Sequence, residues 1–220
     1  MRTDVGLRIA EQRLVAVIRA DDWQLAVSAA DAVVEGGVRI IEVTCTVPQG
    51  DLAIAELRRR YSNGVLVGAG TVTTIDEVKR VADAGAEFLV SPGGTPPLLT
   101  ALAESGLPFA AGALTPSEIM TANEHGADFV KLFPADVLGV TWLRALRGPF
   151  PRVAFIPTGG VSPATVGPWL DAGAVALGTG SGLVPAAALV ARDFRTITKN
   201  ATELVAARDA WRSAVKARST

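Results

Sequence analysis

The sequence predicts an α/β fold, a single-domain (β/α)8 TIM barrel that spans residues 1–220. Eight short apolar runs each precede a segment with helical periodicity. This alternation is typical of a parallel sheet that is covered by helices on its outer face. No linker rich in proline, glycine and serine interrupts the pattern, so we expect no domain boundary.

The expected elements follow one another without a break. Strands are expected at residues 14–18, 38–43, 64–68, 86–90, 107–111, 128–134, 152–156 and 174–177, and helices from 21 or 22 to about 35, then at 50–60, 74–85, 96–105, 115–125, 138–147, 162–172, after 181 and at 201–216. Thr74 with Glu77, and Thr115 with Glu118, have the spacing of capping boxes that begin a helix. Pro116 fits the first helical position, where no backbone N–H is needed.

An open doubly wound sheet is the alternative architecture. Its usual Gly-x-Gly-x-x-Gly sequence after the first strand is absent here, where the strand is followed by Arg19-Ala-Asp. Eight units in 220 residues instead match a barrel at the short end of its size range.

Composition and charge exclude several classes of protein. The net charge is −1 and no basic run is present, which argues against nucleic acid and anionic membranes as partners. No window reaches the roughly 18 apolar residues of a membrane-spanning helix, and the N-terminal stretch lacks a signal-peptide core. A single cysteine, Cys45, permits no intramolecular disulfide. We therefore expect a cytoplasmic protein without a membrane partner.

The scarcity of histidine and cysteine limits the possible chemistry. His125 is the only histidine, and its place before Gly126 indicates the end of a helix. Cys45 is expected to fill space and not to act as a nucleophile. A Ser-His-Asp triad and a zinc cluster are therefore improbable, and we expect neither a metal nor a cofactor.

Lys131 is the most unusual residue of the chain. It stands in the apolar run Phe129-Val-Lys-Leu-Phe133, whereas the three other lysines lie in polar or helical contexts. Burial penalises the charged ammonium, and the free amine of a desolvated lysine can attack a carbonyl. The alternative is a lysine at the end of a strand whose amine reaches water.

Polar residues stand at the C-terminal ends of the predicted strands, and a barrel has its active site at this end. They are Arg19, Glu42, Thr71, Ser91 to Gly94, Lys131, Pro157 to Gly160, and Gly178 to Ser181. Glu42 is expected to lie close to a cation, because a buried unpaired carboxylate is costly. The pair of Glu42 and this cation has either a catalytic or a purely structural role.

The turns after the last two strands resemble a phosphate site. Gly159-Gly160 and Gly178-x-Gly180-Ser181 allow backbone N–H groups to approach an anion, and the Ser181 hydroxyl adds a donor. Two tight turns without a ligand are the alternative. A lysine, a carboxylate and a phosphate cradle together indicate imine chemistry on a phosphorylated carbonyl compound.

Five motifs, spread in order over most of the chain, are similar to those of one family. They read Gly36-Gly-Val-Arg-Ile-Ile-Glu-Val-Thr, Val67-Gly-Ala-Gly-Thr-Val, Phe88-Leu-Val-Ser-Pro-Gly, Val130-Lys-Leu-Phe-Pro-Ala and Ile156-Pro-Thr-Gly-Gly-Val. Together they resemble the 2-keto-3-deoxy-6-phosphogluconate (KDPG) aldolases, a family that includes the 4-hydroxy-2-oxoglutarate (KHG) aldolases. The resemblance implies a homotrimeric class I aldolase that cleaves KDPG to pyruvate and glyceraldehyde 3-phosphate, as in the Entner–Doudoroff pathway.

The resemblance also implies the site residues. Lys131 matches the Schiff-base lysine and Glu42 the general acid and base. The substrate-binding positions comprise Arg19 and Thr71 at the pyruvate carboxylate, Pro92 and Phe133 around the imine, and Thr158, Gly159, Gly160 and Ser181 at the phosphate end. Thr46 departs from the pattern, because many members have an arginine there, which affects recognition of the distal part of the substrate.

The alternative substrates within this chemistry are KHG and the galactonate-derived epimer, 2-dehydro-3-deoxy-6-phosphogalactonate. Two other classes remain as alternatives: a phosphate-binding barrel that isomerises or only binds a sugar phosphate, and a metal-dependent pyruvate aldolase. The first makes Lys131 a charge partner. The second requires a carboxylate cluster that the sequence does not display.

Overall fold

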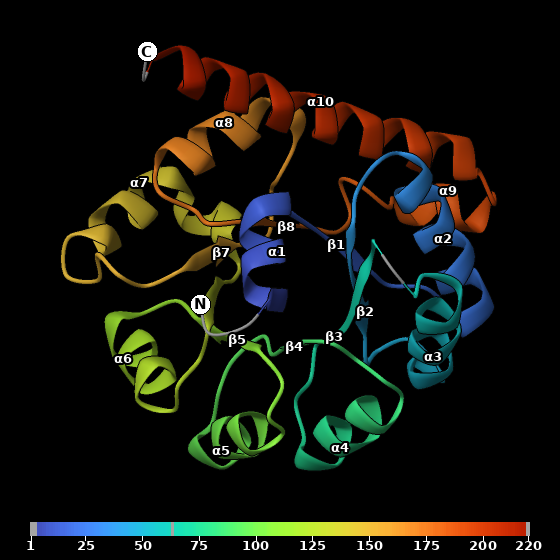
Figure 1. Cartoon of the computed structure of the whole chain (residues 1–220), viewed down its shortest axis with the longest axis horizontal. Coiled ribbons are helices and arrows are strands. Elements are labelled where there is room, and N and C mark those ends of the chain that lie inside the picture. Colours follow the sequence, from blue (N-terminus) through green and yellow to red (C-terminus); the bar gives the residue numbers. More distant parts are fainter. Residues whose placement is uncertain (1–3, 63, 219–220) are drawn as a thin grey trace.

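Eight parallel strands form a central barrel that helices surround in the computed structural model, which describes residues 4–62 and 64–218 (Figure 1). The strands are β1 (Leu14–Ile18), β2 (Ile40–Thr44), β3 (Leu66–Gly70), β4 (Leu89–Val90), β5 (Phe109–Ala113), β6 (Phe129–Leu132), β7 (Phe155–Pro157) and β8 (Leu177–Thr179). The helices are α1 (Asp4–Gln12), α2 (Trp23–Glu35), α3 (Gly50–Arg60), α4 (Ile75–Asp83), α5 (Pro96–Glu104), α6 (Pro116–Glu124), α7 (Ala135–Arg147), α8 (Pro163–Asp171), α9 (Ala186–Val190) and α10 (Phe194–Arg218). The predicted single-domain (β/α)8 barrel is confirmed.

The order of the strands excludes the open doubly wound sheet. From β1 to β7, each strand pairs with the next one in the sequence, and β1 also pairs with β8. An isolated bridge between Thr158 and Gly178 joins the ends of β7 and β8. A hydrogen bond of 2.9 Å from the Val175 N–H to the Phe155 carbonyl adds to this closure. The sheet is therefore a nearly closed barrel.

The buried apolar residues form two clusters, one on each face of the sheet. The larger cluster lies between the strands and the surrounding helices and includes Ile41 and Leu177. The smaller cluster fills the barrel interior, where Ile40 and Phe129 face inward. Side chains alternate between the two faces along each strand, so Glu42 and Lys131, two residues after Ile40 and Phe129, also point inward.

Several strands lie about two residues closer to the C-terminus than the apolar runs predicted. β3 covers Leu66–Gly70 where residues 64–68 were expected, and β8 covers Leu177–Thr179 where 174–177 were expected. The apolar runs include buried residues, such as Val65 and Ala176, that lie just before the hydrogen-bonded part of the strand. They end early because glycine and polar residues form the last part of these strands, which approaches the mouth of the barrel.

The helix boundaries follow the capping signals closely. Thr74 and Thr115 each accept a hydrogen bond from the N–H three residues later, and both capping boxes are complete. Asp22 caps α2 by accepting from the Leu25 N–H. α7 begins earlier than expected and is kinked at Gly139, whose φ is 70°.

The helix α1 was not predicted. It lies at the centre of the barrel in a view close to the barrel axis (Figure 1), and its Ile9 packs into the interior cluster. α1 therefore covers the end of the barrel where the strands begin. Among the helices of the described residues, none has the length and apolar character required to cross a membrane.

Candidate active site

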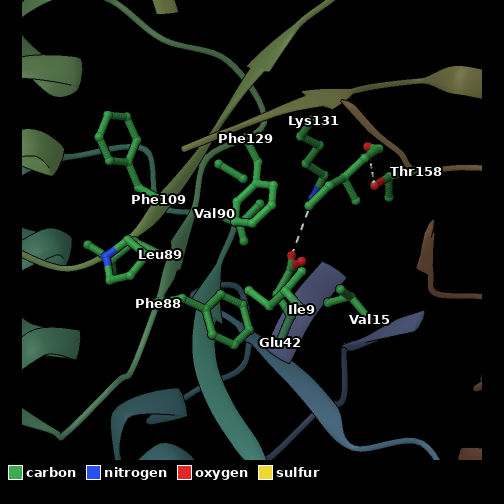
Figure 2. A pocket seen from close by; sticks show the side chains of 13 residues that line it. Ile9, Val15, Glu42, Phe88, Leu89, Val90, Phe109, Phe129, Lys131 and Thr158 are labelled. Atoms are coloured by element: carbon green, nitrogen blue, oxygen red, sulfur yellow. Dashed lines mark hydrogen bonds and ion pairs between the residues drawn. The ribbon is translucent and has the colours of Figure 1, made fainter. Parts of the chain in front are cut away.

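Lys131 and Glu42 meet inside the barrel. Lys131 Nζ lies 3.3 Å from Glu42 Oε1, and the two residues are 3% and 2% exposed (Figure 2). They come from β6 and β2, which lie on different sides of the barrel. Such burial excludes the alternative that the Lys131 amine reaches bulk water. Glu42 thus has a cationic partner, as expected, and that partner is Lys131.

Glycines on β3 make room for this pair. A Cβ atom at Gly70 would overlap the Glu42 carboxylate, and one at Gly68 would lie 2.6 Å from the ring of Phe88. The register places Gly68 opposite Glu42 on the neighbouring strand. The inner wall beside Glu42 is therefore backbone, which leaves the carboxylate free to extend toward β6.

A small apolar cavity lies beside the pair, on the side that faces α1. Its volume is about 20 Å³, enough for about one water molecule. Figure 2 shows apolar side chains around it, among them Ile9, Phe88, Val90 and Phe129, with Glu42, Lys131 and Thr158 at its polar edge. Because bulk water is excluded from this side, the charges of Lys131 and Glu42 interact strongly.

A second, larger pocket opens at the ends of β1, β6, β7 and β8. Its volume is about 480 Å³, within the usual range for small-molecule sites. Six of the predicted site residues line it, namely Arg19, Phe133, Thr158, Gly159, Gly160 and Ser181. Thr158 lines both this pocket and the inner cavity, so this pocket, the distal pocket, borders the wall that carries Lys131 and Glu42.

The turn after β7 has a backbone that only glycine adopts readily. Gly159 has a φ of 111° and Gly160 a φ of 66°. The turn therefore presents backbone to the pocket without side chains. Gly178 on β8 is equally constrained, because a Cβ there would overlap the Thr158 hydroxyl.

The structure places the remaining predicted residues apart from these two spaces. Thr71 and Pro92 line neither the inner cavity nor the distal pocket. Thr71 has a φ of 54° and follows Gly70, the residue that lies against the Glu42 carboxylate. The backbone of Pro92 crosses Gly112 of β5 so closely that a Cβ at Gly112 would overlap it. Phe133 lies with its ring centroid 5.6 Å from Lys131 Nζ.

Thr46, the position at which many members of the resembled family have an arginine, is exposed. Its hydroxyl lies 2.8 Å from the Thr44 hydroxyl, which in turn donates to the Ile18 carbonyl at 3.1 Å. The buried Thr44 was not predicted, although it follows Glu42 by two residues and so shares its face of β2. The only sequence signal for Thr44 was the alternation of side chains along a strand, which puts it on the same face as Glu42.

Asp136 is the second residue that the sequence analysis missed. It stands in the first turn of α7 and lines the distal pocket. The only sequence signal for Asp136 was its acidic side chain two positions after the proline that follows β6. Its carboxylate lies beside the glycine turn that follows β7.

Cys45 and His125 lie where the sequence analysis expected them. Burial, together with the negative charge of Glu77, raises the pKa of the Cys45 thiol to about 11. The thiol is therefore protonated at neutral pH and is a weak nucleophile. His125 caps α6, with its Nδ1 2.9 Å from the Thr121 carbonyl oxygen. In residues 4–62 and 64–218, no three side chains of histidine, cysteine, aspartate or glutamate form a group suited to a metal ion.

Comparison with known proteins identifies the family. A family model described as KDPG and KHG aldolase matches residues 5–200. The chain is 42% identical to the KHG/KDPG aldolase of Escherichia coli (strain K12) over 193 residues, 87% of this chain and 90% of that protein. It is 40% identical to the 2-dehydro-3-deoxy-phosphogluconate aldolase of Dickeya dadantii (strain 3937), over 88% of this chain and 91% of that one.

A solved structure gives the same result. The KDPG aldolase from Legionella pneumophila, with pyruvate captured at low pH as a covalent carbinolamine intermediate, superposes with a TM-score of 0.84. Its identity to this chain is 32%, and the match covers 93% of this chain and 99% of that one. The chain therefore belongs to the KDPG and KHG aldolase family and is an aldolase.

Proposed function

We propose that this protein cleaves KDPG to pyruvate and glyceraldehyde 3-phosphate through an imine on Lys131. The observation that carries the proposal is the buried pair of Lys131 Nζ and Glu42 Oε1 at 3.3 Å, beside a pocket with two glycine turns. Residues 1–220 form the single catalytic domain in this proposal.

The Lys131 amine begins the reaction by attacking the C2 carbonyl of KDPG. The resulting carbinolamine loses water to give a protonated imine, which is an electron sink. For the amine to attack, its proton has to leave, and Glu42 is the base within reach of Nζ. Glu42 then gives this proton to the hydroxyl of the carbinolamine, which leaves as water, so Glu42 is a carboxylate again before the cleavage step.

Cleavage then needs a base at the C4 hydroxyl. Glu42 accepts that proton, the C3–C4 bond breaks, and the bonding electrons move into the imine to form an enamine. Glyceraldehyde 3-phosphate leaves as the aldehyde. Glu42 returns the proton to C3 of the enamine, and water hydrolyses the imine to release pyruvate and the free lysine.

The remaining site residues bind the substrate in this proposal. Ser181 and the N–H groups of the Gly159-Gly160 turn hold the phosphate, because these groups can approach an anion closely. Arg19 lines the same pocket, so we assign its positive charge to the phosphate end and not to the pyruvate carboxylate, where the resemblance to the family had placed it. Thr158 and Phe133 shape the wall next to the imine. Thr71 and Pro92 border the pyruvate half from the loops after β3 and β4.

A ranking of substrates tests this assignment. We expect kcat/KM to be highest for KDPG and at least about 100-fold lower for KHG, because KHG leaves the phosphate donors of the distal pocket unpaired. The galactonate-derived epimer, which keeps the phosphate, is expected to fall between the two. Pyruvate release coupled to lactate dehydrogenase measures all three rates. A kcat/KM for KHG equal to that for KDPG would contradict the proposed substrate.

We place this aldolase in the cytoplasm, as expected from its sequence, and we assign it a homotrimeric state, as its resemblance to the family implies. Light scattering should give three times the chain mass of 22.7 kDa. A monomer mass at micromolar concentration would exclude the trimer.

A further inference from the structure

Asp136 brings a carboxylate to the glycine turn of the distal pocket. A Cβ atom built on Gly159 would lie 2.9 Å from Asp136 Oδ1, and one built on Gly160 would lie 2.7 Å from Asp136 Cβ. Asp136 also lines the pocket itself. The groups proposed to hold a phosphate thus have an anion as their immediate neighbour.

The distal pocket contains one charge of each sign. Arg19 is its cation and Asp136 its anion. Within the described parts of the chain, neither side chain forms a hydrogen bond or an ion pair. Both are therefore available to a ligand, and a ligand that is only an anion would satisfy Arg19 while being repelled by Asp136.

Helix stabilisation is the simplest alternative explanation for an acidic residue at this place. Asp136 lies in the first turn of α7, where a negative charge interacts favourably with the helix dipole. The kink at Gly139 separates this turn from the rest of α7, which reduces the number of aligned peptide units behind it. A role in the helix alone would change stability without any dependence on the substrate.

The chemistry of a carboxylate defines what it recognises. An ionised carboxylate only accepts hydrogen bonds, so the matching group on the substrate is a donor. In KDPG the donor closest to the phosphate is the C5 hydroxyl, which takes no part in bond cleavage. The aldehyde released from KHG is glyoxylate, which has no such hydroxyl.

We propose that Asp136 is a specificity-determining residue that accepts a hydrogen bond from the hydroxyl next to the phosphate-bearing carbon of the aldehyde half. The inference rests on the proposed function and defines its substrate class more narrowly. The pocket selects a hydroxylated chain that ends in an anion. The anion lies at Arg19, Ser181 and the glycine turn, and the hydroxyl lies at Asp136.

A matched pair of aldehydes isolates this hydroxyl in the direction of synthesis. Condensation of pyruvate is measured with glyceraldehyde 3-phosphate and with 3-oxopropyl phosphate, which differ only in the hydroxyl. In Asp136→Ala we expect kcat/KM for glyceraldehyde 3-phosphate to fall at least about tenfold, because a hydrogen bond to a charged group is lost. For 3-oxopropyl phosphate we expect no loss, because this aldehyde has no hydroxyl to donate and the repulsion between Asp136 and its phosphate is removed.

The control is Asp76→Ala, which removes an exposed first-turn acid of α4 that lines neither cavity. It should leave both rates unchanged. Equal losses with both aldehydes, or gains with both, would overturn the role of Asp136 as a hydroxyl acceptor. Borohydride trapping of pyruvate on the Asp136→Ala protein shows that the imine still forms. If the unaltered protein condenses pyruvate with neither aldehyde, it is the proposed function that fails.

Discussion

Lys131→Met is expected to abolish aldolase turnover, with a loss in kcat of at least about 10⁴-fold, as for other nucleophiles that form covalent intermediates. Methionine fills a similar space but has no amine, so neither the carbinolamine nor the imine can form. Sodium borohydride added with pyruvate should give no covalent adduct on this variant. In the unaltered protein, peptide mass analysis should locate the adduct on Lys131.

The matched control is Lys199→Met. Lys199 is 73% exposed on α10 and lies 3.8 Å from Glu203 in a surface ion pair. Surface pairs of this kind contribute about 0–1 kcal/mol, so both turnover and trapping should persist. An adduct that forms at an unchanged rate on Lys131→Met would disprove the Schiff-base mechanism.

A loss of activity in Lys131→Met has a second cause to exclude, namely a loss of folded protein. Removal of one partner leaves Glu42 buried without its cation, which typically costs about 3–5 kcal/mol. The double variant Lys131→Met with Glu42→Gln removes both charges, so it should be more stable than Lys131→Met in urea unfolding. It should be equally inactive. That result would separate the loss of the amine from a loss of folded protein.

The barrel could be predicted because each of its units repeats the same signals. Capping residues such as Thr74 and Thr115 and the apolar runs act over a few neighbouring residues, so the sequence displays them directly. α1 could not be found in this way. Its Ile9 packs against the ends of several strands, and contacts between distant segments leave no local pattern. The end of β3 was predicted too early for a related reason, because Gly70 belongs to the strand but leaves space for Glu42 inside the barrel, and this contact has no local pattern.

The sequence predicted which strand ends carry polar residues, but it did not predict how closely those residues lie to one another. Strand counting placed Glu42 and Lys131 at one end of the barrel, since parallel strands end together there. Their contact at 3.3 Å depends on the absence of a side chain at Gly70, which only the three-dimensional register reveals. Asp136 was missed because it follows β6 in a helix turn, and its approach to Gly159 depends on how two loops pack.

Glu42→Gln is expected to slow the proton transfers at C3 and C4 more than it slows imine formation with pyruvate, because water can also take the proton of the Lys131 amine. Glutamine has nearly the same shape, so it should fit beside Gly70 as glutamate does. It cannot accept a proton at neutral pH, and loss of a general base lowers kcat by about 10²–10⁴-fold. Exchange of the pyruvate methyl protons with deuterated water, followed by NMR, reports the C3 step alone. We expect that exchange to fall by a similar factor.

The control is Glu118→Gln, which alters a capping-box carboxylate far from the barrel interior. Hydrogen bonds from the Leu114 and Thr115 N–H groups hold the pKa of Glu118 below its usual value. This variant should lose some stability and keep its rate of exchange. Exchange at the normal rate in Glu42→Gln would contradict the role of Glu42 as the proton shuttle. The pair would then be structural, with Glu42 serving only as the charge partner of Lys131. A complete loss of borohydride trapping would show that imine formation, too, depends wholly on Glu42 as the base that activates the amine.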